Sequence, residues 1–341
     1  MTVKINVGGV WRSVTNLCPK VGGLYKQVVG VFVNVGGVWR STVQDIIEQW
    51  RKTDVGYATS IAVDTSGNAY ISYNNAAGTT SVRKLNSAGI QQWALTDIEN
   101  AIGIAVDTAN NVYIAYNSPV GTTSVRKLNS AGIQQWALTD IENANGIAVD
   151  TAGNVYVAYY NAAGTTSVRK LNSAGAQVWA NADVGYTIGI AVDAANNVYV
   201  AYNNAAGTIS VRKLNSAGAQ VWALTDVGNA IDIAVDAASN VYVAYYSPVG
   251  TTSVRKLNSA GVQVWALTDV GYATSIAVDA AGFVYVGYNR STGITVRKLN
   301  SAGVQVWALT DVAYSTSIAV DATSNVYAGY YSMVRKLNPI W

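Results

Sequence analysis

The sequence predicts an all-β fold: a seven-bladed β-propeller that is closed by a strand near the amino terminus and preceded by a small β-hairpin segment. Three observations predict it. A strand-forming tetrapeptide recurs seven times at steps of 43 or 42 residues, and each period contains four short β-rich segments separated by turn residues. The last period lacks its fourth segment, which a segment before the first period supplies.

A long internal repeat fills most of the 341 residues. The tetrapeptide Ile-Ala-Val-Asp ends at positions 64, 107, 150, 193, 236, 279 and 321, and Val-Arg-Lys-Leu-Asn starts at positions 82, 125, 168, 211, 254, 296 and 334. A tryptophan recurs in the same phase, but its seven copies begin at Trp50, before the first Ile-Ala-Val-Asp, and end at Trp307. A period of this length is expected of a propeller blade.

Each period contains four short segments with strand character. In the third copy these are residues 146–150, 154–160, 165–171 and 176–180, which are rich in Val, Ile, Tyr and Thr. The intervening Thr-Ala-Gly, Asn-Ala-Ala-Gly and Asn-Ser-Ala-Gly are turn sequences. No segment carries a 3.6-residue apolar pattern long enough for a helix, so the sequence excludes helical solenoids of similar period.

The two ends of the repeat predict how the ring closes. The last copy runs to Asn338-Pro-Ile-Trp341 without a complete fourth strand, whereas Asp45-Ile-Ile-Glu-Gln-Trp50 supplies a fourth strand with no preceding three. We expect residues 44–52 to complete the seventh blade, because this pairing covers sheet edges that would otherwise stay open. Trp341 is the alternative occupant of part of that place. The propeller then spans residues 44–341.

Composition excludes several classes of protein and of chemistry. Charged residues make up 12% and hydrophobic residues 50%, which excludes a disordered chain, and no apolar run approaches the roughly 20 residues that span a bilayer. The first residues lack the apolar core of a secretory signal. A single cysteine, Cys18, excludes an internal disulfide framework, and we expect it to be a small buried residue. The absence of histidine excludes histidine-dependent catalysis and histidine-ligated metals.

We expect no cofactor and no metal. The Asp-x-x-x-Asn turn offers one carboxylate per blade, whereas a calcium ion needs roughly six to eight oxygen ligands. A role of this aspartate in the turn is therefore the better interpretation.

Variation between blades falls on one face of the predicted ring. If Ile-Ala-Val-Asp is the innermost strand, the loop before it (56–59 in the first copy) shares a face with the loop between the second and third strands (74–78). Both loops vary from copy to copy, and we call this the variable face. The turns of the opposite face are short and uniform, as expected where Asp caps a turn and Gly or Asn takes a positive φ.

The variable face carries the candidate ligand-binding residues. Its loops are rich in Tyr, Asn, Ser and Gly, which antibody paratopes use because Tyr gives rigid contact area and Asn adapts its hydrogen bonds. A ring of shallow sites suits carbohydrate or another repetitive polar ligand through multivalency. Packing between blades is the competing role for the same side chains. The candidates are Tyr57, Asn100, Asn143, Tyr186, Asn229, Tyr272 and Tyr314, together with the charged residues Glu99, Glu142, Asp232 and Arg290.

The four charged candidates differ from the other charges between residues 53 and 341, which belong to the repeat. Two aspartates per blade account for 14 of 19 acidic residues and the repeated Arg-Lys for 14 of 22 basic residues, and we expect these to form neutralising pairs between blades. With 17 basic and 19 acidic residues from Asp45 onward, the propeller has no basic stripe for nucleic acid. Glu99 and Glu142 hold equivalent positions in adjacent blades, which leaves a glycosidase or lyase as an alternative, although nothing evident raises the pKa of either carboxyl.

Residues 1–43 form a separate segment with a shorter repeat. Val-Gly-Gly followed by an apolar, an aromatic and a basic residue starts at Val7, Val21 and Val35, and each Gly-Gly predicts a tight hairpin turn. The segment has five basic residues and no acidic one. Three small hairpins bury little core, so we expect them to dock on another chain, on copies of themselves or on the propeller. The attachment candidates are Trp11, Arg12, Tyr25, Lys26, Trp39 and Arg40.

Two resemblances follow from these motifs. IAVDTAGNVYVAY, from Ile147 to Tyr159, resembles the NHL and SBBP families of β-propeller repeats, and this resemblance covers residues 44–341. It implies the fold, while such propellers serve ligand binding, scaffolding and a few enzymatic activities. The VxVGGVW(K/R)-like copies of the first 43 residues resemble short repeats in structural proteins of tailed bacteriophages, especially tail and fibre components. This implies a virion protein whose amino-terminal arm anchors to the particle while the propeller projects outward.

We therefore expect a non-enzymatic structural or adhesive protein of a bacteriophage virion, assembled in the host cytoplasm and released by lysis. Its partners would be other virion proteins, through residues 1–43, and a host-surface glycan or receptor, with no nucleic acid and no membrane insertion; a homo-oligomer is left open. The alternatives are a purely structural assembly or decoration scaffold, an intracellular scaffold with a dimerising arm, and a polysaccharide-cleaving enzyme that uses Glu99 and Glu142.

Overall fold

The computed structural model describes residues 46–339, apart from 75–79, 97, 99, 118–122, 142–143, 161–165, 182–185, 204–208, 226–228, 247–251, 269–271, 290–294 and 311–313. Before residue 46 it describes the backbone of six short strands. None of the described residues belongs to a helix of the length and apolarity needed to cross a membrane.

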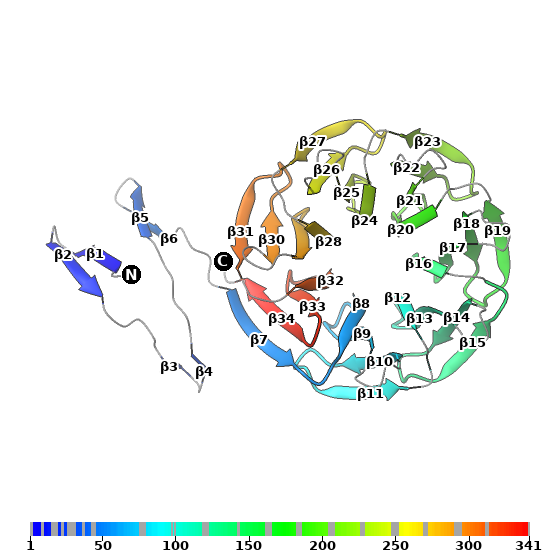
Figure 1. The fold of residues 1–341 in the computed structure, drawn as a ribbon, viewed down its shortest axis with the longest axis horizontal. Helices are drawn as coiled ribbons and strands as arrows, with labels where there is room; N and C mark the ends of the chain where they lie inside the picture. Colours follow the sequence, from blue (N-terminus) through cyan, green and yellow to red (C-terminus); the bar gives the residue numbers. More distant parts are fainter. Residues whose placement is uncertain are drawn as a thin grey trace. The chain divides into compact units, whose positions relative to one another are not determined.

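Seven four-stranded antiparallel sheets form a closed ring, with the first strand of each sheet at the centre and the fourth at the rim (Figure 1). This confirms the predicted all-β, seven-bladed propeller. Blades 1 to 3 comprise β8 (Tyr57–Val63), β9 (Ala69–Asn74), β10 (Thr80–Leu85) and β11 (Gln91–Leu95); β12 (Ala101–Val106), β13 (Val112–Asn117), β14 (Thr123–Leu128) and β15 (Gln134–Leu138); β16 (Ala144–Val149), β17 (Val155–Tyr160), β18 (Thr166–Leu171) and β19 (Gln177–Asn181). Blades 4 to 6 comprise β20 (Tyr186–Val192), β21 (Val198–Asn203), β22 (Ile209–Leu214) and β23 (Gln220–Leu224); β24 (Asn229–Val235), β25 (Val241–Tyr246), β26 (Thr252–Leu257) and β27 (Gln263–Leu267); β28 (Tyr272–Val278), β29 (Val284–Asn289), β30 (Val296–Leu299) and β31 (Gln305–Leu309). Blade 7 comprises β32 (Ser315–Val320), β33 (Val326–Tyr330), β34 (Val334–Pro339) and β7 (Ile46–Lys52).

The amino-terminal strand closes the ring as predicted. β7 forms the outer strand of blade 7, next to β34, although almost 290 residues separate them; Arg335 and Glu48, 287 positions apart, form an ion pair across this junction. Trp50 on β7 also ties blade 7 to blade 1, because its Nε1 donates to the Ser87 carbonyl at 3.1 Å. Trp341, the alternative occupant, lies outside the described residues.

The core lies between the blades. On β9 five successive residues are buried, because both faces of this second strand are covered by neighbouring blades, whereas the outer strand β11 alternates exposed and half-buried residues. In blade 1, Leu85 and Ile71 pack with Tyr327 and Val334 of blade 7. Each fully buried Val or Leu contributes roughly 1.5–3 kcal/mol relative to an exposed one. The closing junction therefore has the same kind of core as the others.

The aspartate of Ile-Ala-Val-Asp has the turn role that the sequence predicts. Asp150 Oδ1 accepts from the amides of Ala152 and Asn154 at 3.0 and 2.8 Å, and its Oδ2 accepts from Asn154 Nδ2 and from the buried Tyr156 hydroxyl at 2.8 and 3.0 Å. Gly153 takes a φ of 77° in this turn. Both oxygens of this carboxylate thus accept hydrogen bonds from the turn and from the strand that follows it.

The amino-terminal segment contains three separate two-stranded sheets. They are β1 (Val3–Val7) with β2 (Val10–Val14), β3 (Lys20–Val21) with β4 (Leu24–Tyr25), and β5 (Phe32–Val35) with β6 (Val38–Ser41). The innermost pairs are Val7 with Val10, Val21 with Leu24, and Val35 with Val38. The Gly-Gly dipeptides between them, where the sequence predicts tight turns, lie outside the described residues. The side chains of the six attachment candidates, and Cys18, lie outside the described residues.

Candidate functional site

The variable face is a real feature of the structure. Tyr57 opens the inner strand of blade 1, and its ring lies 5.0 Å from that of Tyr331, in the turn between the second and third strands of blade 7. On the opposite face, a Cβ on Gly67 in the Asp64 turn would lie 3.5 Å from the Cβ of Ser87 in the Asn-Ser-Ala-Gly turn. The loops that vary therefore share one face and the uniform turns share the other.

An exposed tyrosine patch occupies part of the variable face, over three consecutive blades. We define it as Tyr57 of blade 1 and Tyr314 and Tyr331 of blade 7, whose rings contact one another, together with Tyr272, which holds the position equivalent to Tyr57 in blade 6. Tyr314 and Tyr331 meet edge to face with centroids 5.5 Å apart. Tyr57, Tyr272 and Tyr331 are 39%, 56% and 52% exposed, so these rings present a large apolar area to solvent. Partial burial and the Tyr331 ring raise the pKa of Tyr57, so its hydroxyl stays a hydrogen-bond donor at neutral pH.

The other predicted loop residues are placed only in part. Asn100 is exposed and takes a φ of 50°, a conformation that asparagine tolerates better than most residues. The backbones of Tyr186 and Asn229 begin β20 and β24, but their side chains are outside the described part of the chain, as are Asn143 and Arg290. Glu99 and Glu142, the pair behind the glycosidase alternative, also lie outside the described residues.

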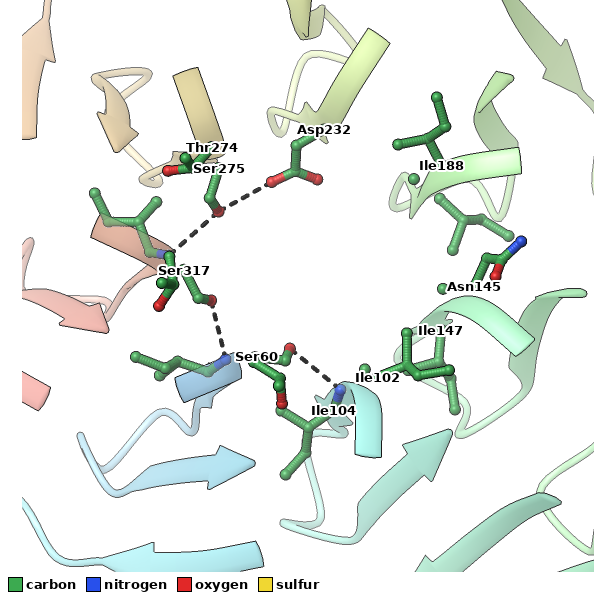
Figure 2. Close-up of a pocket in the computed structure, with 18 residues that line it drawn as sticks. Ser60, Ile102, Ile104, Asn145, Ile147, Ile188, Asp232, Thr274, Ser275 and Ser317 are labelled. Atoms are coloured by element: carbon green, nitrogen blue, oxygen red, sulfur yellow. Dashed lines mark hydrogen bonds between the residues drawn. The ribbon is translucent and has the colours of Figure 1, made fainter. Parts of the chain in front are cut away.

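Asp232 lies in a different place from the one the sequence predicts. We expected it among the loop charges of the variable face, but it is the fourth residue of β24 and lines the central channel (Figure 2). In every blade a β-bulge lies directly before this position and shifts the register between the first two strands. Asp232 itself resumes the regular pairing, opposite Ala244, and so belongs to the strand that lines the channel and not to the loop.

The Asp232 carboxylate is held by three donors. Its Oδ1 accepts from the Ile233 amide at 2.8 Å, and its Oδ2 accepts from the Ile276 amide at 2.9 Å and from the Ser275 hydroxyl at 3.0 Å. Burial raises the pKa of Asp232, and the three hydrogen bonds oppose this shift. Since all three partners are donors, the arrangement suits the carboxylate form.

The channel contains a cavity of about 260 Å³ lined by the inner strands. The side of the cavity formed by blades 5, 6, 7 and 1 is polar, with Asp232, Ser275, Ser317 and Ser60 at equivalent positions. On the side formed by blades 2, 3 and 4, the same position is glycine: Gly103, Gly146 and Gly189. We call these two sides the polar arc and the glycine arc.

Sequence reasoning missed Tyr331 and the serines of the polar arc. The signal for Tyr331 was the shortened loop of the last copy, which places this ring between Tyr57 and Tyr314. The signal for the polar arc was the residue before each Ile-Ala-Val-Asp, which reads Ser, Gly, Gly, Gly, Asp, Ser, Ser along the chain.

The repeated charges are arranged differently from the prediction. Arg83 and Arg169 pair with Asp54 and Asp140, which precede the inner strands of their own blades, at 2.7 and 2.8 Å. The lysine donates to a backbone carbonyl of the next blade, as Lys84 does to Ser130 at 3.1 Å, and lies over the Tyr70 ring. The expectation of acid–base pairs between blades is thus wrong for these residues. Among the described side chains no three acidic or thiol groups gather as a metal site would require.

The fold is shared with solved structures of low sequence similarity. The chain is similar to the WD40 β-propeller domain of Doa1, with a TM-score of 0.67 and 11% identity over 86% of this chain and 97% of that one. It is also similar to BamB from Moraxella catarrhalis, with a TM-score of 0.52 and 16% identity over 82% of this chain and 83% of that one. No protein-family model matches the chain, and neither does any curated protein.

These similarities show a seven-bladed propeller fold and do not single out the NHL or SBBP repeats or a bacteriophage origin. The propeller is a fold that typically serves as a scaffold for binding ligands or proteins, so function has to be argued from the sites themselves.

Proposed function

We propose that this chain is a non-enzymatic binding protein whose variable face contacts a host-surface ligand, with glycan as the ligand class. The tyrosine patch is the observation that carries this proposal. Exposed aromatic rings offer flat apolar area beside a polar hydroxyl, the combination that suits the two faces of a sugar ring. The patch lies on the face where the loops vary, whereas the opposite face repeats the same turns.

We further propose that the amino-terminal hairpins attach the protein to a bacteriophage particle, which would locate it in the virion. The support is the Val-Gly-Gly repeat and its resemblance to short repeats of tail and fibre proteins, together with five basic residues and no acidic one in residues 1–43. Such a segment suits an acidic docking partner.

Glycan-array binding of the purified chain tests the surface site. We expect Tyr57→Ala, Tyr272→Ala and Tyr331→Ala each to weaken binding at least about tenfold, the usual threshold for an interface residue that matters. Tyr57→Phe should retain most of the binding, because it keeps the ring. The matched control is Ile90→Ala together with Ile133→Ala, two exposed residues of the uniform turns. Undiminished binding by the three tyrosine variants would rule out the patch.

One observation favours a second function, that of a structural scaffold. The uniform turns of blades 1, 2, 5 and 6 expose Ile90, Ile133, Val262 and Val304 at 60–62%, and apolar side chains of this kind suit protein contact. If the protein is only a scaffold, no glycan will bind, and deletion of residues 1–43 will still abolish its attachment to particles. Particle attachment that survives this deletion would contradict the proposed role of the hairpins.

A further inference from the structure

A belt of hydrogen bonds joins the inner strands around part of the channel. In four blades, the amide of the Ile that begins Ile-Ala-Val-Asp donates to the side chain that precedes the equivalent Ile of the neighbouring blade. Figure 2 shows the three of these contacts in which a serine is the acceptor. The pairs are Ile104 with Ser60 at 3.3 Å, Ile276 with Asp232 at 2.9 Å, Ile318 with Ser275 at 3.2 Å, and Ile61 with Ser317 at 3.2 Å. An alcohol oxygen is the acceptor in three of these four contacts.

The glycine arc interrupts this belt. Ile147 and Ile190 follow Gly103 and Gly146 around the ring, and a Cβ on these glycines would lie 3.6 and 3.7 Å from the two amide nitrogens. The amides therefore face the space that a serine side chain fills elsewhere in the belt. In the described part of the chain no side chain accepts from either amide, and such donors gain from an acceptor when they are shielded from water.

The third glycine of the arc, Gly189, also leaves a neighbouring Ile amide without a serine acceptor, and Asp232 takes that place. Gly189 has no side chain to offer to Ile233, so Asp232 accepts from this amide with its Oδ1 while its Oδ2 serves Ile276 and Ser275. The belt thus ends at a carboxylate on one side of the glycine arc and at the Ser60 contact with Ile104 on the other. Two amides remain between these ends.

The chemistry of the lining selects the class of molecule that fits this gap. Asp232 is the one charged residue among the described residues that line the cavity, so an anion would be repelled and a metal ion would find a single carboxylate. The neighbouring blades already show the matching group, because serine hydroxyls accept from the Ile amides, and the Ser275 hydroxyl also donates to Asp232. A neutral molecule with several adjacent hydroxyl groups can do both.

We propose that the glycine arc binds a small neutral polyol, a free hexose or hexitol, whose hydroxyl groups accept from the amides of Ile147 and Ile190 and donate to Asp232. The cavity of about 260 Å³ admits a molecule of this size and lies below the usual range for larger ligands. Polyol binding in the channel does not require glycan binding by the tyrosine patch.

Calorimetric titration of the full chain with glucose, galactose, mannose and sorbitol tests this proposal. We expect saturable binding of at least one of them. The double variant Gly103→Ser/Gly146→Ser should weaken it at least tenfold, because its hydroxyls would complete the belt and fill the arc. A Cβ at these positions meets Ile147 and Ile190 methyl groups at 3.1 and 3.2 Å, so small adjustments suffice. Should this variant fold poorly, Asp232→Asn decides, since it removes the charged acceptor and should also weaken binding.

Two further measurements distinguish the channel site from the tyrosine patch, and a free sugar from an oligosaccharide. Tyr272→Ala should leave the titration unchanged even if it abolishes glycan-array binding, and an oligosaccharide of the same sugar should bind the channel more weakly than the free hexose. Absence of saturable binding of all four probes would overturn the proposal and leave water as the occupant of the arc. Equal affinity in the wild type and in the folded double variant would also overturn it.

Discussion

At the scale of single residues, one serine carbonyl in a blade serves two side chains of the preceding blade. Lys84 Nζ and Trp93 Nε1 both donate to the Ser130 carbonyl, each at 3.1 Å. The same pair of donors recurs at five further junctions, with Ser87, Ser173, Ser216, Ser259 and Ser301 as acceptors. At the junction of blades 6 and 7 the sequence reads Asn338-Pro339 instead of Asn-Ser, and the Trp307 Nε1 has no acceptor among the described residues.

Lys298 stands at that junction and gives a pH-dependent prediction. Its side chain is fully buried, its ammonium group lies 3.9 Å from the Phe283 ring centroid, and burial lowers its pKa to about 8, against the opposing effect of Asp279. Between pH 8 and the ordinary lysine pKa of 10.5, the unfolded chain binds more protons at this site than the folded chain, so stability rises with pH. We expect Lys298→Met to remove a rise on the order of 1 kcal/mol between about pH 8 and 9.5, as measured by urea unfolding.

The matched control is Lys256→Met, which removes the lysine that donates to the Ser301 carbonyl at 3.2 Å. This variant should keep the rise with pH, because Lys298 is intact. It should also destabilise the protein at pH 7, since it breaks a hydrogen bond at a buried position. Equal flattening of the two pH profiles would contradict the assignment to Lys298.

At the scale of elements, the same junction distinguishes β31 from the other outer strands. Trp265 on β27 donates from Nε1 to the Ser301 carbonyl at 3.0 Å, whereas Trp307 on β31 is 5% exposed and its Nε1 has no acceptor among the described residues. We expect Trp265→Phe to destabilise the protein by about 1–3 kcal/mol more than Trp307→Phe, because only the former breaks a hydrogen bond. Chemical unfolding of the two variants measures this difference, and equal costs would show that Trp307 has an acceptor.

The strands were predictable from the sequence because each short apolar run is bounded by turn residues, but the bulge in the inner strand was not. A bulge adds one residue to one strand without any residue type that the pattern requires, so the sequence does not mark where the variable loop ends and the channel-lining strand begins beside Asp232. The consequence is specific: a charge expected on the surface ends a hydrogen-bonded belt inside the channel. The division of these positions into a block of polar residues and a block of glycines can be interpreted only once the blades are arranged in a ring.

At the scale of the whole molecule, the repeat made the fold predictable and left the candidate site only partly so. Seven near-identical copies fix the number of blades, and the displaced tryptophan phase predicts the closing strand β7. The tyrosine patch combines Tyr57, Tyr314 and Tyr331, which are as many as 274 positions apart and meet because blade 7 adjoins blade 1. This proximity results from ring closure and from a shortened loop. The residue types of the three tyrosines alone do not predict it.

Ring closure through β7 also predicts which truncations the propeller tolerates. Deletion of residues 1–43 leaves β7 intact, with the ion pair between Glu48 and Arg335 and the packing of Trp50 against Tyr327 at a centroid distance of 5.9 Å. The two arginines beside Glu48 outweigh the effect of its burial and hold the pKa of this carboxyl below its usual value, so the pair persists at neutral pH.

Deletion of residues 1–52 removes the strand, leaves the edge of β34 open and uncovers the core beside Tyr327. We expect the chain without residues 1–43 to keep one cooperative thermal transition near that of the full chain. The chain without residues 1–52 should unfold with a midpoint at least about 10 °C lower, or should associate through the open edge of β34. Circular dichroism melts with light scattering measure both outcomes, and an unchanged midpoint for a monomeric 53–341 chain would show that the ring does not depend on β7.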